Sequence, residues 1–132
     1  MFESMQEHGP ATIELALPDA PDPAGWLEEA RATLPGPGTY LAYRDREEIH
    51  LFPIEEGWTR IGRSAAADIR LDHPSVSRRH ALIVLEEPKA MRVLDDRSLN
   101  GVFVNGEEID WSRLSDGDVL AIGRFRLVAL EA

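Results

Sequence analysis

The chain has 132 residues, 43% of them apolar, which suits one folded domain and is too short for two of ordinary size. Its net charge of -10 argues against general nucleic-acid binding, because that affinity comes from neutralising many phosphates. The absence of cysteine excludes disulfides, thiolate metal sites and thiol nucleophiles, and it fits a reducing compartment such as the cytoplasm.

Residues 1–38 are expected to form an acidic extension with one short helix. The first ten residues lack the basic and apolar parts of a secretory leader, and no stretch approaches the roughly 18 apolar residues of a spanning helix, so we expect no export signal and no membrane association. Asp22-Pro23 is typical of a helix start, and the prolines and glycines of 35–38 end the pattern, so the helix is predicted over 23–34. Its apolar face consists of Trp26, Leu27, Ala30 and Leu34. This segment either packs on the main domain or binds a partner, with disorder as the remaining alternative.

From Thr39 to Ala132 the pattern predicts strands separated by turns, and therefore an all-β domain over 39–132. Asn105-Gly106 is the strongest hairpin signal, because a two-residue type I′ turn needs positive φ at both central positions. The candidate strands are 40–43, 49–52, 58–61, 81–85, 91–94, 102–104, 119–122 and 125–130.

The charge is unevenly distributed along the chain. Residues 1–50 carry a net charge of -7, from ten carboxylates and three arginines, whereas residues 59–80 carry five arginines and only two carboxylates. An acidic protein therefore contains one basic segment. Such a segment suits a single phosphate better than a duplex, whose many phosphates the whole chain would repel.

Motifs in this segment and behind it resemble those of a forkhead-associated (FHA) domain, a phosphothreonine-recognition module. Each motif is weak alone, but the ordered set over about 70 residues is specific. The resemblance implies an eleven-stranded antiparallel β-sandwich with its binding loops at one end. The matching residues are Gly62-Arg63-Ser64, Ser77-x-x-His80, Asp95-x-x-Ser98-x-Asn100-Gly101 running on to Asn105-Gly106, Leu114-x-x-Gly117-Asp118 and Ile122-Gly123.

The same residues suit the chemistry of a phosphate ester. Phosphothreonine carries nearly two negative charges and three acceptor oxygens, so its receptor needs a fixed cation and several neutral donors. Arg63 is the expected clamp, because a guanidinium grips two phosphate oxygens with a planar fork. The Ser77 hydroxyl is expected to donate to the phosphate, and Arg78 and Arg79 are candidate contacts to phosphate or peptide, with plain solvent exposure as the alternative.

A second loop completes the predicted site by resemblance. Ser98 contributes to the phosphate pocket, and Asn100 binds the peptide backbone, since its amide offers both a donor and an acceptor. Gly101 permits a backbone geometry that a Cβ would obstruct. The predicted phosphopeptide-binding set is Arg63, Ser77, Arg78, Arg79, Ser98, Asn100 and Gly101.

Other residues are predicted to support the site. Gly62, Asn105 and Gly106 are expected to shape strand ends and turns, and the resemblance makes His80 a structural residue that holds the serine loop. A hydrolytic pairing of Ser77 with His80 is not expected, because the Gly-x-Ser-x-Gly elbow is absent. No histidines show metal-ligand spacing, so neither a metal nor another cofactor is expected.

The sequence thus predicts a non-enzymatic adaptor that binds phosphothreonine sites made by a Ser/Thr kinase. One alternative is a self-regulated switch, as in similar small bacterial proteins, in which a phosphorylated N-terminal threonine docks on its own FHA domain. Thr12 and Thr33 are the candidates, although neither lies in the paired-threonine pattern of those relatives. A second alternative is an interaction domain that works without phosphorylation.

Overall fold

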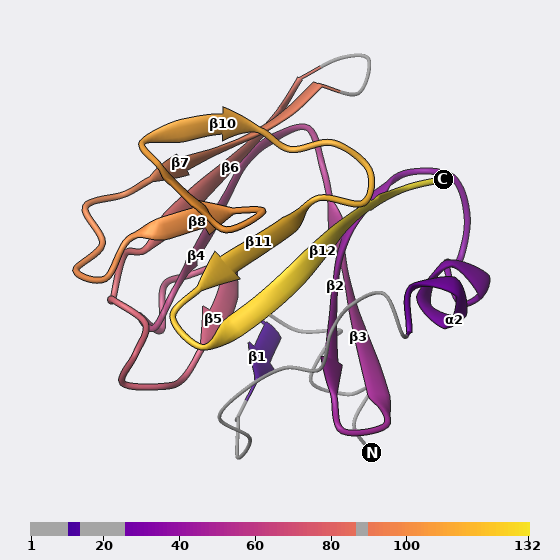
Figure 1. Cartoon of the computed structure of the whole chain (residues 1–132), viewed down its shortest axis with the longest axis horizontal. Coiled ribbons are helices and arrows are strands. Elements are labelled where there is room, and N and C mark those ends of the chain that lie inside the picture. Colours follow the sequence, from indigo (N-terminus) through magenta and orange to yellow (C-terminus); the bar gives the residue numbers. More distant parts are fainter. Residues whose placement is uncertain (1–10, 14–25, 87–89) are drawn as a thin grey trace.

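The computed structural model describes residues 11–13, 26–86 and 90–132. Two six-stranded sheets pack face to face as a sandwich (Figure 1). The first sheet has the order β1 (Ala11–Ile13), β5 (Ile69–Leu71), β4 (Gly57–Gly62), β6 (Ala81–Glu86), β7 (Ala90–Asp95) and β10 (Trp111–Arg113). The second has the order β3 (Glu48–Ile54), β2 (Thr39–Asp45), β12 (Phe125–Glu131), β11 (Val119–Ile122), β8 (Val102–Val104) and β9 (Glu107–Ile109).

The predicted all-β sandwich is confirmed, and β2 to β12 are eleven strands within the described part of 39–132. The eight strands expected from the pattern all exist, as β2, β3, β4, β6, β7, β8, β11 and β12. Strand β5 departs from the antiparallel expectation: it pairs parallel with β4, placing Gly62 opposite Arg70, and parallel with β1, placing Thr12 opposite Arg70 on its other side. The other described pairings are antiparallel.

The main core lies between the sheets and follows the period of two expected for strands. In β2, for example, Leu41 and Tyr43 face this core, whereas Tyr40 and Ala42 face the opposite side. Both sides of β2 and β12 are buried, because a helix covers the outer face of the second sheet.

That helix is α2 (Leu27–Ala32), which lies on the side of the molecule away from β4 and β7 (Figure 1). It is shorter than the predicted 23–34, and the expected start at Asp22-Pro23 lies outside the described residues. Trp26 and Ala30 are fully buried against β2 and β12, which favours the packing alternative for this part of the extension. No helix in the described segments has the length and apolar character that a bilayer crossing requires.

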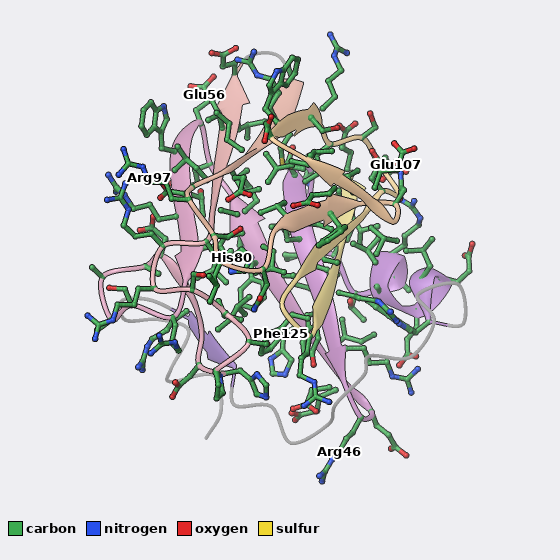
Figure 2. The ribbon with its side chains drawn as sticks, turned by 60° about the vertical axis from the view of Figure 1, so that its left-hand side comes forward. Arg46, Glu56, His80, Arg97, Glu107 and Phe125 are labelled. Atoms are coloured by element: carbon green, nitrogen blue, oxygen red, sulfur yellow. The ribbon has the colours of Figure 1, made fainter. Side chains whose placement is uncertain are left out.

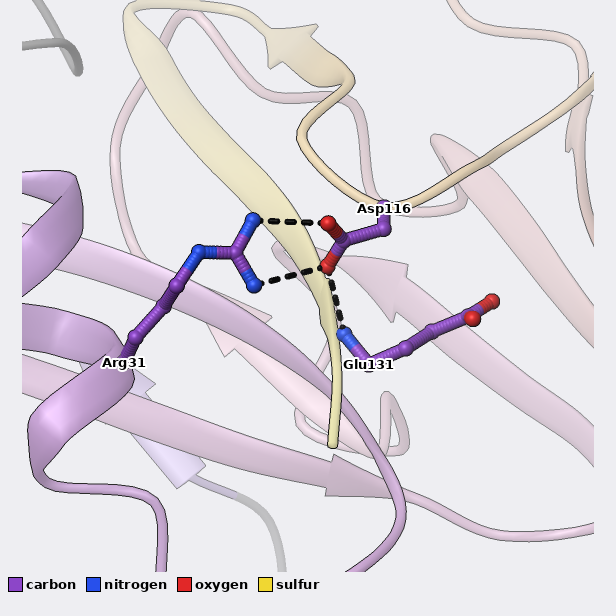
Figure 3. Close-up of polar contacts among 3 residues, drawn as sticks. All are labelled: Arg31, Asp116 and Glu131. Atoms are coloured by element: carbon purple, nitrogen blue, oxygen red, sulfur yellow. Dashed lines mark hydrogen bonds and ion pairs between the residues drawn. The ribbon is translucent and has the colours of Figure 1, made fainter.

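One ion pair joins α2 to the loop between β10 and β11. Both terminal nitrogens of Arg31 donate to the Asp116 carboxylate at 2.7 and 3.0 Å, and the same carboxylate accepts the Glu131 N–H at 2.8 Å (Figure 3). The helix is therefore held by apolar burial and by one bidentate contact at its exposed side.

The hairpin predicted at Asn105-Gly106 is also confirmed. It joins β8 to β9, and its central residues have φ values of 51° and 89°, the positive values that a type I′ turn requires. The Asn105 side chain accepts the Val119 N–H at 2.9 Å and donates to Asp118, so this turn is tied to the start of β11.

Candidate functional site

Three loops meet at one end of the sandwich, and they carry the residues singled out by the sequence. The loop after β4 begins at Arg63, the loop before β6 contains Ser77, and the loop between β7 and β8 contains Ser98. The first two loops are joined by main-chain hydrogen bonds from Arg63 N–H to the Ser77 carbonyl at 2.9 Å and from Ser64 N–H to the Arg78 carbonyl at 3.2 Å. The sequence separates these loops by up to 35 positions, and the fold brings them together.

Gly62 allows this close approach of two backbones. A Cβ at Gly62 would collide with the Arg78 carbonyl group, whose carbon would lie 2.9 Å away, and would stand 3.2 Å from the Ser77 carbonyl oxygen. Because these are backbone atoms of the serine loop, any side chain at this position would push that loop away from Arg63. The glycine is thus required for packing rather than for an unusual dihedral angle.

His80 links the serine loop to the third loop from a fully buried position. Its Nδ1 accepts the Ser77 N–H at 3.0 Å, so in the neutral ring the proton is on Nε2, which donates to the Gly101 carbonyl at 2.8 Å. Burial lowers the pKa of His80, although the Gly101 hydrogen bond and the nearby Asp95 charge oppose that shift. The neutral ring joins two backbone segments through these hydrogen bonds. It is labelled in the interior of the molecule in Figure 2 and has no solvent access for acid–base chemistry.

The two site serines also connect the loops. The Ser77 hydroxyl oxygen accepts the Leu99 N–H at 2.9 Å, and the Ser98 hydroxyl oxygen accepts the Gly101 N–H at 2.9 Å. Each hydroxyl therefore acts as an acceptor in these bonds, which leaves its own O–H available to donate. Both serines are half-buried, at a depth where an incoming phosphate oxygen can still reach them.

Gly101 takes a positive φ of 94°, and a Cβ there would stand 2.8 Å from a Glu108 carboxylate oxygen. Both the positive φ and the lack of space for a Cβ therefore favour glycine at this position, as the sequence predicts. The turn before it is anchored by Asp95, whose carboxylate accepts the Ser98 N–H at 2.8 Å.

Arg63 lies half-buried beside Ser77. Its Nε donates to the Val76 carbonyl at 2.9 Å, and its own carbonyl accepts from Arg70 Nε at 2.9 Å. Among the described residues its two terminal nitrogens have no hydrogen-bond partner. A guanidinium fixed through Nε with both terminal nitrogens free can offer a two-pronged grip to an anion.

The other two arginines of the predicted set differ from each other. Arg78 is exposed, and its side chain has no polar partner within the described part of the chain. Arg79 makes a bidentate pair with Asp96, at 3.1 and 3.2 Å, and this hydrogen bond raises the pKa of Arg79. The structure thus gives Arg79 an intramolecular partner that the sequence did not indicate.

Asn100 is exposed at the rim, and its Nδ2 donates to the Ser75 carbonyl at 3.2 Å. Ser75 was missed by sequence reasoning, yet it connects several parts of this rim: its hydroxyl accepts the Arg124 N–H at 3.1 Å and lies 2.8 Å from His73 Nδ1. Gly123, at φ 58°, packs so closely on Ser75 that a Cβ would stand 2.7 Å from its carbonyl oxygen. The Ile122-Gly123 pair is among the residues of the family resemblance, but its sequence alone does not predict this contact.

The described residues contain no group of three or more histidines or carboxylates that could hold a metal ion. What the three loops assemble is a surface of one fixed guanidinium, two hydroxyl groups and a rim amide. Such a surface suits the binding of an oxyanion on an extended chain.

Comparisons with known proteins agree with this geometry. A family model described as FHA domain matches residues 59–123. The glycogen accumulation regulator GarA of Mycobacterium tuberculosis is 38% identical over 115 residues, covering 85% of this chain and 70% of that protein. A solved structure from a study of phosphothreonine-dependent FHA domain interactions is 30% identical, with a TM-score of 0.67 over 71% of this chain and 96% of the other. Mycobacterium tuberculosis EmbR, solved with a low-affinity phosphopeptide, is 32% identical, with a TM-score of 0.65 over 83% of this chain and 29% of EmbR.

Proposed function

The chain belongs to the forkhead-associated domain family, and from that membership we propose that it is a binding module for phosphothreonine peptides. The observation that carries the proposal is Arg63, whose Nε is held by the Val76 carbonyl next to Ser77 and whose two terminal nitrogens have no hydrogen-bond partner among the described residues. The family relatives support the ligand class, since one solved relative holds a phosphopeptide. We propose binding and release without chemistry.

In this proposal each predicted residue has a distinct role. Arg63, Ser77 and Ser98 bind the phosphate, Arg78 and Arg79 bind the phosphate or the peptide, and Asn100 binds the peptide backbone, while Gly101 holds the loop in place. The structural residues Gly62, His80, Asn105 and Gly106 keep the loops in position. The upstream Ser/Thr kinase and the cytoplasmic location remain predictions from the sequence.

The expected affinity is modest. Three or four charge-assisted hydrogen bonds of about 1.5 to 3 kcal/mol each must offset an association cost of about 4 to 15 kcal/mol. The phosphate alone therefore cannot hold a peptide tightly, and flanking residues must add contacts. We expect dissociation constants on the order of micromolar.

The direct test is a titration with one threonine peptide in phosphorylated and unphosphorylated forms, followed by calorimetry. We expect binding of the phosphorylated form only, and loss of that binding in Arg63→Gln. Arg46→Gln is the matched control, because it removes the same charge from an exposed arginine at the tip of the β2–β3 hairpin, away from His80 and Arg97 (Figure 2). Equal affinity for both peptides would refute phosphate recognition.

One observation bears on the alternative of a self-regulated switch. Thr12 lies in β1, which pairs with β5 on the same sheet as the arginine loop, whereas Thr33 follows α2 and donates its hydroxyl to the Ala30 carbonyl. Thr12 is thus the better candidate for docking on the site, which would require β1 to leave the edge of β5. Kinase treatment of Thr12→Ala and Thr33→Ala, read by mass spectrometry and by phosphopeptide binding, separates the two. This alternative fails if phosphorylation of the chain leaves peptide binding unchanged.

A further inference from the structure

A depression lies next to the proposed phosphate site at the end of β4. Its apolar lining, which we call the floor, consists of Ile61, Ala66 and Ala67. Its polar lining, which we call the rim, consists of Ser64, Asp96 and three arginines. The rim arginines are Arg60, Arg78 and Arg79.

The charges of this depression are mostly unpaired. Among the described residues, the exposed side chains of Arg60 and Arg78 have no carboxylate partner. Asp68 is near Arg60, but its carboxylate accepts the main-chain N–H of Arg60 at 2.8 Å rather than a guanidinium N–H. Arg79 is neutralised by Asp96 through Nε and one terminal nitrogen, which leaves its other terminal nitrogen available. The rim therefore keeps an excess of positive charge in a chain whose net charge is -10.

The depression is continuous with the phosphate site through the backbone. Ser64 lines the depression and directly follows Arg63, and its N–H is bonded to the carbonyl of Arg78, which also lines it. The rim amide of Asn100 is tied to Ser75, on the opposite side of Ser77 in the serine loop. An extended peptide advances about 3.3 Å per residue, so a residue one to three positions from a phosphothreonine at Arg63 would lie over the depression.

We propose that this depression is a second anion subsite, which binds a carboxylate or a second phosphate of the same phosphothreonine peptide. The proposal rests on the proposed function, because it places the first phosphate at Arg63. The alanine floor leaves room for a side chain, and the arginine rim selects a negatively charged one. The preferred partner is therefore a phosphothreonine flanked by an acidic group on one side.

The test uses one neutral phosphothreonine peptide and a matched set with a single Glu at each of the three positions on either side. A second set carries a phosphothreonine in place of the Glu, which distinguishes the two sources of negative charge. We expect the acidic group on one side to tighten binding by about two- to tenfold, an advantage that falls with added salt. The same substitutions on the other side should have little effect.

Four variants tie the effect to the depression. Arg60→Gln should remove the acidic preference while the neutral phosphothreonine peptide binds as before, and Arg46→Gln should change neither. Ala66→Glu should disfavour the acidic peptides by placing a carboxylate on the floor, whereas Ala66→Gln of similar size should not. The inference is overturned if the neutral peptide binds and acidic flanks add nothing, or if Arg60→Gln weakens all phosphopeptides alike. If no phosphothreonine peptide binds at all, the proposed function itself has failed.

Discussion

The loop surface around Arg63 and the α2 contact are held to the same sandwich by different forces. The three loops are joined by directional hydrogen bonds, most of them donated by backbone N–H groups to side chains, with His80 linking Ser77 to Gly101. Helix α2 is held by the burial of Trp26 and Ala30 on the outer face of β2 and β12, with one ion pair at its exposed side. Hydrogen bonds therefore hold the three loops in a defined geometry, whereas apolar burial holds α2 against the sheet that it covers.

The two kinds of contact therefore serve different purposes, because one sets the geometry of binding and the other contributes to the stability of the fold. Hydrogen bonds fix distance and angle, so a loop held by them presents its donors in one geometry. Apolar burial is non-directional and scales with area, so it contributes free energy of folding without setting the position of any donor. Changes at α2 should therefore alter stability alone, and changes at His80 should alter stability and binding together.

The largest expected effect on stability is at Trp26. Trp26→Ala removes a side chain that is only 1% exposed, and we expect a loss of about 3 kcal/mol in the free energy of unfolding. Urea denaturation measures this loss, and calorimetry should find phosphothreonine-peptide affinity unchanged in the folded variant. If the affinity falls under conditions in which nearly all of the variant is folded, α2 is part of the recognition surface and the contrast between the two regions is wrong.

Trp26→Phe is the matched control for that variant. The Trp26 Nε1–H is buried and has no hydrogen-bond partner in the described part of the chain, so removing it discards an unsatisfied donor. We expect Trp26→Phe to recover most of the stability that Trp26→Ala loses.

The second largest effect is at His80, where both readouts should change. His80→Ala leaves the Ser77 N–H and the Gly101 carbonyl without their partner in a buried place, at about 1 to 3 kcal/mol for each group. We expect a loss of roughly 2 to 4 kcal/mol in unfolding free energy and a weaker grip on phosphopeptide from misplaced loops. Arg63→Gln is the contrast, with binding lost and stability retained. If His80→Ala binds normally once folded, the hydrogen bonds do not position the loops.

The candidate site residues could be named from the sequence because they lie in short motifs with fixed spacing. The loops that carry Arg63, Ser77 and Ser98 meet in the structure through the hydrogen bonds already described, and the roles of these residues in binding stay predictions. Contacts that no motif indicates could not be predicted from the sequence. Arg79 pairs with Asp96, 17 positions away, and Asn100 reaches Ser75, 25 positions away. Both contacts depend on how separate loops cross, and nothing in the local sequence specifies that crossing.

The strands divide in the same way. The eight predicted ones are three to seven residues long, and most show alternating or continuous apolar residues. The four missed strands, β1, β5, β9 and β10, have three residues each, too few to display a period of two, and none is a run of three apolar residues like Val102–Val104 of β8. Their pairing with neighbouring strands defines them, so only the folded chain reveals them.

A smaller effect should appear on acidification, and at the loop surface it should come from His80. Burial lowers the pKa of His80, so the unfolded state takes up the proton first as pH falls. The corresponding stability is complete above the unfolded pKa near 6.5 and is lost as pH falls from there toward the folded pKa. A protonated Nδ1 cannot accept the Ser77 N–H, so hydrogen exchange should show Ser77 losing protection as pH falls through the lowered pKa of folded His80, while the Ala30 amide of α2 keeps it.

Two controls separate that titration from others. Burial also lowers the pKa of His50, which contributes with the same sign, so His50→Gln should retain the Ser77 response and lose the remainder. The phosphate of a bound peptide titrates near 6 as well, so the exchange experiment is run without peptide. Equal loss of protection at Ser77 and Ala30 would mean that acid loosens the whole sandwich rather than its recognition end.

The smallest effect is expected at the ion pair between Arg31 and Asp116. The two side chains are 33% and 38% exposed, and solvent screens such a pair to about 0.5 kcal/mol despite its bidentate geometry. Arg31→Gln should therefore lower the free energy of unfolding only slightly. Asp116→Ala should lower it more, because it also removes the acceptor of the Glu131 N–H.

A double-mutant cycle with urea denaturation isolates the pair from the Glu131 contact. The hydrogen bond from Arg31 lowers the pKa of Asp116, so the contribution of the pair is present above the ordinary carboxyl pKa of 3.8 and disappears as pH falls through the lower folded value. It should also shrink with added salt. A coupling well above 1 kcal/mol that resists salt would mean that α2 is held in one orientation by polar contacts. In that case α2, like the three loops, would be held by directional polar contacts rather than by apolar burial alone.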